Sequence, residues 1–213
     1  VYENRDVKRH YPGLAEAAHL IGSLQIQNRA AVGGNLCNGS PAADTTPALI
    51  ALRAKARVAG PNGEREVAVE DFCVSPGRTV LQPGELLVQI LIPAPSQNSA
   101  DAYLRLIPRN EMDIAVVGAG VALTLDGDKV KAARVALAAV APKPLYVPKA
   151  GDALAGKKLD DSSIAAAARA AMDASTPIDD MRGTAEYRKH VVGVLTTRAI
   201  KLAAERARNA GKA

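Results

Sequence analysis

Residues 31–52 read AVGGNLCNGSPAADTTPALIAL, in which a glycine-rich polar segment is followed directly by an apolar one. Gly33 and Gly34 permit positive φ values and leave their backbone N–H groups open to close approach. The pattern predicts a helix over residues 43–51, and the N-terminus of a helix attracts anions. The stretch therefore predicts a phosphate-binding cradle in front of a helix.

The same segment supplies side chains for a hydroxylated ligand. Asn35 and Ser40 are neutral hydrogen-bond donors, and Asp44 can accept hydrogen bonds from a ribose or ribityl chain. An ordinary glycine turn followed by a helix cap is the alternative interpretation, which a lone pair of glycines leaves open. Neither GxGxxG nor GxxxxGK[ST] occurs in the chain, so neither a Rossmann site nor a P-loop is predicted.

The composition is that of a globular protein. With 213 residues and 48% apolar character, the chain can bury a substantial core as one large or two small domains. It has no apolar run of about 18 residues and no signal-peptide pattern, so we expect a cytoplasmic protein without membrane insertion. Cys37 and Cys73 are too few for a disulfide framework or a metal site, and we expect two free thiols. The first residue is Val1 and the opening reads like the middle of a domain, so we expect residues upstream.

The net charge of +5 is concentrated near the C-terminus, where residues 182–213 hold eight basic and two acidic residues. A basic helix can bind the phosphates of nucleic acid, or it can face solvent or a partner protein. Aromatic residues make up only 3% of the chain and tryptophan is absent, so stacking platforms for bases are scarce. We therefore favour a partner-facing helix and expect no nucleic-acid binding.

The hydrophobic patterns predict an α+β fold. Helical periodicity is found over residues 13–23, 43–51, from Ser162 or Ser163 to about Asp173, and over 185–208. Alternating patterns predict a hairpin over 54–69, a strand over 84–93 and a long antiparallel hairpin over 113–140. The Pro- and Ser-containing segment 93–101 is the best linker, which places a domain boundary near residue 97.

Four segments resemble one family, the FAD-binding medium subunits of molybdenum hydroxylases of the carbon monoxide dehydrogenase and xanthine dehydrogenase type. They are QIQNRAAVGGNLCNGSPAADTTPALIAL (25–52), GELLVQILIP (84–93), YLRLIPRNEMDIAVVGAGVAL (103–123) and GTAEYRKHVVGVLTTRAI (183–200). Their order over most of the chain makes the resemblance specific. It implies that residues 1–96 are the second subdomain of a two-subdomain FAD-binding domain, and that residues 97–213 are a C-terminal domain of antiparallel sheet packed with helices. The Gly-Gly-His-Ser type loop of the family's first, N-terminal FAD subdomain does not occur in this chain.

The resemblance also implies roles for individual residues. Gly33, Gly34 and Asn35 would lie against the FAD pyrophosphate with Ser40 nearby, and Asp44 would hold the ribityl or ribose hydroxyls. Leu87 would touch the flavin ring. Arg105 would place a cation near the ring, at a position where many relatives carry a lysine. Ala31 departs from the family, because relatives usually carry a threonine or serine hydroxyl there.

The function implied by the resemblance is electron transfer without substrate chemistry on this chain. FAD would pass electrons from two 2Fe-2S clusters on a small subunit to an external acceptor, while a large molybdopterin subunit oxidises the substrate. The assembly would be a dimer of heterotrimers, and the basic last helix is a candidate surface for subunit contacts. We keep two alternatives: a non-catalytic interaction or assembly module that has lost its flavin, and a nucleic-acid binder that uses the basic C-terminal segment.

Overall fold

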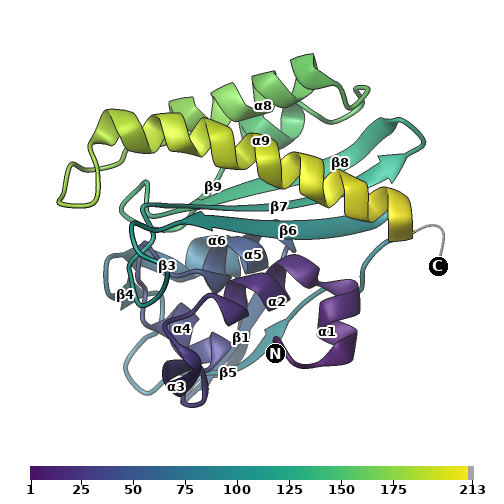
Figure 1. Cartoon of the computed structure of the whole chain (residues 1–213). Helices are drawn as coiled ribbons and strands as arrows, with labels where there is room; N and C mark the ends of the chain where they lie inside the picture. Colours follow the sequence, from purple (N-terminus) through teal and green to yellow (C-terminus); the bar gives the residue numbers. More distant parts are fainter. Residues whose placement is uncertain (211–213) are drawn as a thin grey trace.

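A four-stranded antiparallel sheet separates two layers of helices in the computed structural model, which describes residues 1–210 (Figure 1). The strand order is β6-β7-β8-β9. The strands are β6 (Ser99–Leu106), β7 (Val117–Asp126), β8 (Lys129–Ala138) and β9 (Leu145–Tyr146). The α+β class is thus confirmed.

The C-terminal layer consists of three helices: α7 (Pro148–Asp152), α8 (Asp161–Ala174) and α9 (Ala185–Ala210). They cover one face of the sheet with an apolar core, which includes Leu137, Leu154 and Ile200. The expected cap of α8 at Ser162 or Ser163 is wrong. Asp160 is the N-cap, and Ser163 is the N3 residue that completes a capping box with it.

The N-terminal layer covers the opposite face and is built from short elements. Its helices are α1 (Arg5–His10), α2 (Pro12–His19), α3 (Leu24–Gln27), α4 (Val32–Cys37), α5 (Thr45–Ala51) and α6 (Val69–Phe72). Its strands are β1 (Lys55–Gly60), β2 (Gly63–Ala68), β3 (Cys73–Ser75), β4 (Arg78–Thr79) and β5 (Leu86–Leu91). A second sheet has the order β2-β1-β5, and β3 pairs with β4.

Both predicted hairpins are confirmed, as β1 with β2 and as β7 with β8. Strand β6 was not predicted, because the linker expected over 93–101 includes its first residues. The helix expected over 13–23 ends at His19, and α3 begins after a turn in which Gly22 has φ 53°. Among residues 1–210, no helix is both long and apolar enough to cross a bilayer.

Two glycines of β7 allow the N-terminal layer to lie close to the sheet. A Cβ on Gly120 would come within 2.8 Å of the Pro47 carbonyl group in α5. A Cβ on Gly118 would come within 2.5 Å of the hydroxyl oxygen of Tyr103, which lies on the adjacent strand. The sequence GAG over 118–120 therefore makes room both for the start of α5 and for the Tyr103 phenol.

Candidate cofactor site

The expected glycine loop is wrong: Gly33 and Gly34 lie in the first turn of helix α4, and neither has a positive φ. Within this segment Gly39 is the residue in the left-handed region, with φ 61°. Ala31 is the N-cap and makes no side-chain capping bond, and its carbonyl accepts the Asn35 N–H at 2.9 Å. The three N–H groups that precede this first intrahelical bond point out of the helix end, as at any helix N-terminus. The helical form therefore still presents donors to an anion.

The space in front of α4 is open. A Cβ on Gly34 would meet no atom within 4 Å, and Gly34 is exposed. A Cβ on Gly33 would lie 3.5 Å from Cδ2 of Leu87, so β5 is the neighbour of this turn. A ligand can therefore approach the backbone of α4 beside Leu87.

Asn35 connects α4 to α5. Its Oδ1 accepts a hydrogen bond from the Thr45 hydroxyl at 2.6 Å and lies 3.4 Å from the Thr45 nitrogen. This bond places Asp44, the residue before Thr45, near the α4 turn. Ser40 lies in the turn between the two helices, where its Oγ accepts the Ala42 N–H at 3.2 Å. The side chain of Asn35 thus fixes the geometry between the two helices.

Asp44 faces the sheet instead of capping α5. It occupies the N-cap position, yet its side chain makes no capping hydrogen bond. Its Oδ1 accepts the Tyr103 hydroxyl at 2.8 Å, and its Oδ2 accepts Nη1 of Arg105 at 2.9 Å. The side chains of Asp44 and Arg105 are 10% and 5% exposed. The alternative interpretation of Asp44 as an ordinary helix cap is therefore wrong.

Opposing effects act on the protonation of this cluster. Burial raises the pKa of Asp44, while the Arg105 charge and the hydrogen bonds from Tyr103 and Arg105 lower it. Burial and the neighbouring Asp44 carboxylate raise the pKa of Tyr103 well above its usual value, so the phenol stays protonated and acts as a donor. A buried carboxylate needs such partners, because an unpaired charge in a protein interior is costly.

Tyr103 is the site residue that the sequence analysis missed. It and Arg105 lie two positions apart on β6, so both side chains point to the same face of the sheet. An alternation of polar with apolar residues over DAYLRL, 101–106, carried this signal. It was missed because residues 99–101 were assigned to a linker.

The described residues contain no metal-binding cluster, and the two cysteines are not activated thiols. Burial raises the pKa values of Cys37 and Cys73, which disfavours their reactive thiolate forms. Both thiols are free, as expected. Among residues 1–210, no group of three or more His, Cys, Asp or Glu side chains could hold a metal ion.

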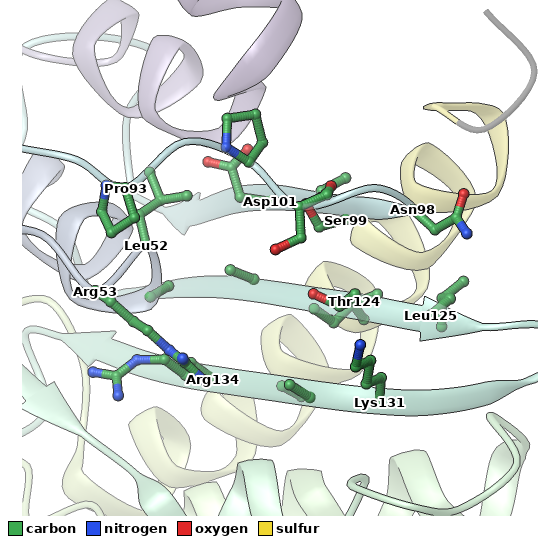
Figure 2. A pocket seen from close by; sticks show the side chains of 18 of the residues that line it. Leu52, Arg53, Pro93, Asn98, Ser99, Asp101, Thr124, Leu125, Lys131 and Arg134 are labelled. Atoms are coloured by element: carbon green, nitrogen blue, oxygen red, sulfur yellow. The ribbon is translucent and has the colours of Figure 1, made fainter.

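A groove of about 580 Å³ lies elsewhere in the described residues. Figure 2 shows it between the segment that carries Pro93 and Ser99 and the strands that carry Thr124 and Lys131. None of the seven residues that the resemblance assigns to the cofactor lines it. Arg134 at its edge is already bound to Glu70 at 2.8 Å. The candidate site around α4 and Asp44 is therefore defined by its polar groups and is separate from this groove.

Comparisons with known proteins agree with the geometry. Residues 1–95 match the family model of the FAD binding domain in molybdopterin dehydrogenase, and residues 102–203 match that of the CO dehydrogenase flavoprotein C-terminal domain. The chain is 37% identical to the carbon monoxide dehydrogenase medium chain of Afipia carboxidovorans, over 93% of this chain and 68% of the relative. It is 29% identical to a putative xanthine dehydrogenase FAD-binding subunit of Escherichia coli, with the same two coverages.

Solved structures show the same relationship. Carbon monoxide dehydrogenase from Hydrogenophaga pseudoflava, in a form that lacks the Mo-pyranopterin moiety, superposes with a TM-score of 0.93 at 35% identity. The match covers 96% of this chain and 71% of the other. Quinoline 2-oxidoreductase from Pseudomonas putida 86 gives a TM-score of 0.86 at 29% identity, with 99% and 72% covered.

The chain belongs to the family of FAD-binding subunits of molybdenum-dependent hydroxylases, which are oxidoreductase subunits. Its relatives include medium chains of multi-subunit enzymes. The residues present fit a dinucleotide: the open N-terminus of α4 suits a pyrophosphate, and the half-exposed Leu87 suits an apolar ring.

Proposed function

We propose that this chain binds FAD against α4 and Asp44 and passes electrons from the 2Fe-2S clusters of a partner subunit to an external acceptor. A large molybdopterin-binding subunit would oxidise the substrate, and the complex would be a dimer of heterotrimers. Residues 1–96 would contribute to cofactor binding and residues 97–213 to the supporting sheet and to subunit contacts. The observation that carries the proposal is that Asn35 and its bonds to Thr45 join the open α4 turn to the buried Asp44 and Arg105 pair.

Each residue has a binding or orienting task. The N–H groups of Gly33 and Gly34 would donate to the pyrophosphate, with Asn35 and Ser40 beside it. Asp44 would accept hydrogen bonds from ribityl or ribose hydroxyls. FAD, when bound, supplies the redox chemistry, so the protein needs no acid, base or nucleophile for that step.

Two further residues would contribute to binding of the flavin ring. Leu87 on β5 would contact the apolar part of the flavin, since its side chain borders the open space next to Gly33. Arg105 would keep a positive charge near the ring, and its bond to Asp44 fixes where that charge lies.

The two alternatives make different use of the chain. The ion pairs Arg182–Asp113, Arg188–Asp180, Lys201–Asp161 and Arg206–Glu16 occupy four basic residues of the C-terminal segment. These pairs reduce the charge available for phosphates, which argues against nucleic-acid binding. An assembly module without flavin would leave the space in front of Gly34 empty, so the flavin content of the purified complex distinguishes it from the proposed function.

Gly34→Val in the full-length subunit, purified with its partners, tests the proposal. The added side chain projects into open space and not into the protein, so the fold should be retained. If a phosphate occupies that space, the flavin absorbance per protein should fall at least about tenfold, as expected when hydrogen bonds to a charged group are lost. Asn38→Val, at the exposed opposite end of α4, is the matched control and should keep its flavin. Normal flavin content in Gly34→Val would contradict the proposed site.

A further inference from the structure

Tyr103 carries a hydroxyl group although its ring is buried in the apolar core of the N-terminal layer. It is the largest side chain among the described residues that are less than 2% exposed. A phenylalanine would fill the same volume without the cost of desolvating a hydroxyl. The one partner of that hydroxyl in the hydrogen-bond pattern of residues 1–210 is Oδ1 of Asp44, at 2.8 Å.

The surroundings of the hydroxyl are shaped for this contact. Gly118 faces it, and a Cβ there would come within 2.5 Å of the hydroxyl oxygen. Gly120 allows α5 to approach, since a Cβ there would come within 2.8 Å of the Pro47 backbone. Together the two glycines bring the start of α5, with Asp44, within reach of β6.

Asp44 is held at both of its oxygens, one by Tyr103 and the other by Arg105. Two bonds to different oxygens fix the plane of a carboxylate, whereas a single bond allows it to rotate. Each carboxylate oxygen has two lone pairs, so each keeps one for a further donor. Because Asp44 does not cap its own helix, its orientation depends on these two partners.

We propose that Tyr103 is a positioning residue of the cofactor site, which fixes the Asp44 carboxylate so that its remaining lone pairs accept hydrogen bonds from the hydroxyl groups of the bound polyol chain. The role rests on the proposed function, because the polyol is the ribityl or ribose part of FAD. Tyr103 itself would not touch the ligand, since it is fully buried.

A double-mutant cycle with Tyr103→Phe and Asp44→Ala tests the inference, with the FAD dissociation constant of the full-length subunit in its complex as the readout. Tyr103→Phe keeps the ring and removes the hydroxyl, and we expect FAD to bind about tenfold more weakly. In the Asp44→Ala background the same change should have no further effect, because the residue acts through Asp44. The double variant leaves Arg105 without its ion pair, as Asp44→Ala alone does, so the Asp44→Ala variant is its reference for both FAD affinity and thermal stability.

Tyr11→Phe is the matched control, because it removes a hydroxyl that donates to the Pro93 carbonyl at 2.9 Å, away from Asp44. It should change thermal stability without changing FAD affinity. A purely structural role for Tyr103 would lower thermal stability and leave FAD affinity unchanged, or would give additive effects in the cycle, and either result would overturn the inference. Failure of the unmodified complex to bind FAD would instead contradict the proposed function.

Discussion

The two faces of the central sheet differ in what they bury. On β6, Ala102 and Leu104 point to the helices α8 and α9, whereas Asp101, Tyr103 and Arg105 point to the N-terminal layer. The first face is packed mainly with apolar side chains, and Arg188 of α9 adds hydrogen bonds to the Val116 and Ala139 carbonyl groups. The second face carries polar side chains that bond to groups from other segments, such as Asp44 and the Leu14 N–H group. A single strand thus supplies apolar packing on one face and, in the proposed function, supports the cofactor site on the other.

Strand β7 also presents different residues to the two layers of helices. Val117, Ala119 and Val121 enter the apolar core, while Gly118 and Gly120 face the N-terminal layer. Glycines on this face lower the surface of the sheet, so α5 can lie against it. The close approach matters for the site because it brings Asp44 to the polar side chains of β6.

The largest effect should follow from filling the space above Gly120. Gly120→Val places a β-branched side chain against the Pro47 backbone, 2.8 Å from the Cβ position, and backbone cannot give way cheaply. We expect the free energy of unfolding to fall by at least about 3 kcal/mol, as measured by urea denaturation. Ala122→Val is the control on the same face and strand, where the wall of the groove leaves room. Equal losses in both variants would show that the close approach of α5 is not the cause.

The polar face should also make stability depend on pH. Burial raises the pKa of Asp101 to about 6, against the opposing effects of the Gly13 and Leu14 N–H groups and the Arg206 charge. Its Oδ2 accepts the Leu14 N–H at 3.1 Å, while its Oδ1 has no partner among residues 1–210. The folded protein therefore binds this proton more tightly than the unfolded chain does, and the resulting stability is lost as the pH rises through about 6.

Asp101→Asn isolates this contribution, because an amide can still accept the Leu14 N–H but does not titrate. We expect the variant to gain stability relative to the unmodified protein by up to about 3 kcal/mol between about pH 4 and pH 7. The measurement is the difference between the two unfolding free energies at each pH. Parallel curves would show that Asp101 does not titrate in this range.

The sequence predicted the apolar face of the sheet better than the polar one. The hairpin of β7 and β8 and the helix α9 followed from periodicity, because burial on one side imposes a regular pattern. Gly33 and Asp44 were predicted from the glycine-rich segment, and Arg105 came from the resemblance to a family. The structure adds the neighbours Leu87 and Tyr103.

The features of the site that the sequence did not predict depend on contacts between residues far apart in the chain. The bond from Tyr103 to Asp44 spans 59 positions of sequence and could not be read from a local pattern. The pair Gly33 and Gly34 favours a loop by propensity, yet the segment is helical because the buried Leu36 anchors α4 in the core. Tertiary packing thus overrode local preference at the site, as is common where a structure serves a ligand.

The smallest predicted effect concerns the cap of α4. Ala31 is exposed and has the extended backbone of an N-cap, with φ −133° and ψ 146°, but no side-chain oxygen. Ala31→Thr supplies an oxygen that can accept an N–H of the first turn, and such a cap contributes about 1 kcal/mol. We expect that gain in the unfolding free energy measured without FAD. Ala31→Val has nearly the same shape and no hydroxyl, so it should give no such gain. Equal stabilisation by valine would assign the effect to apolar contact instead of to a hydrogen bond at the end of α4.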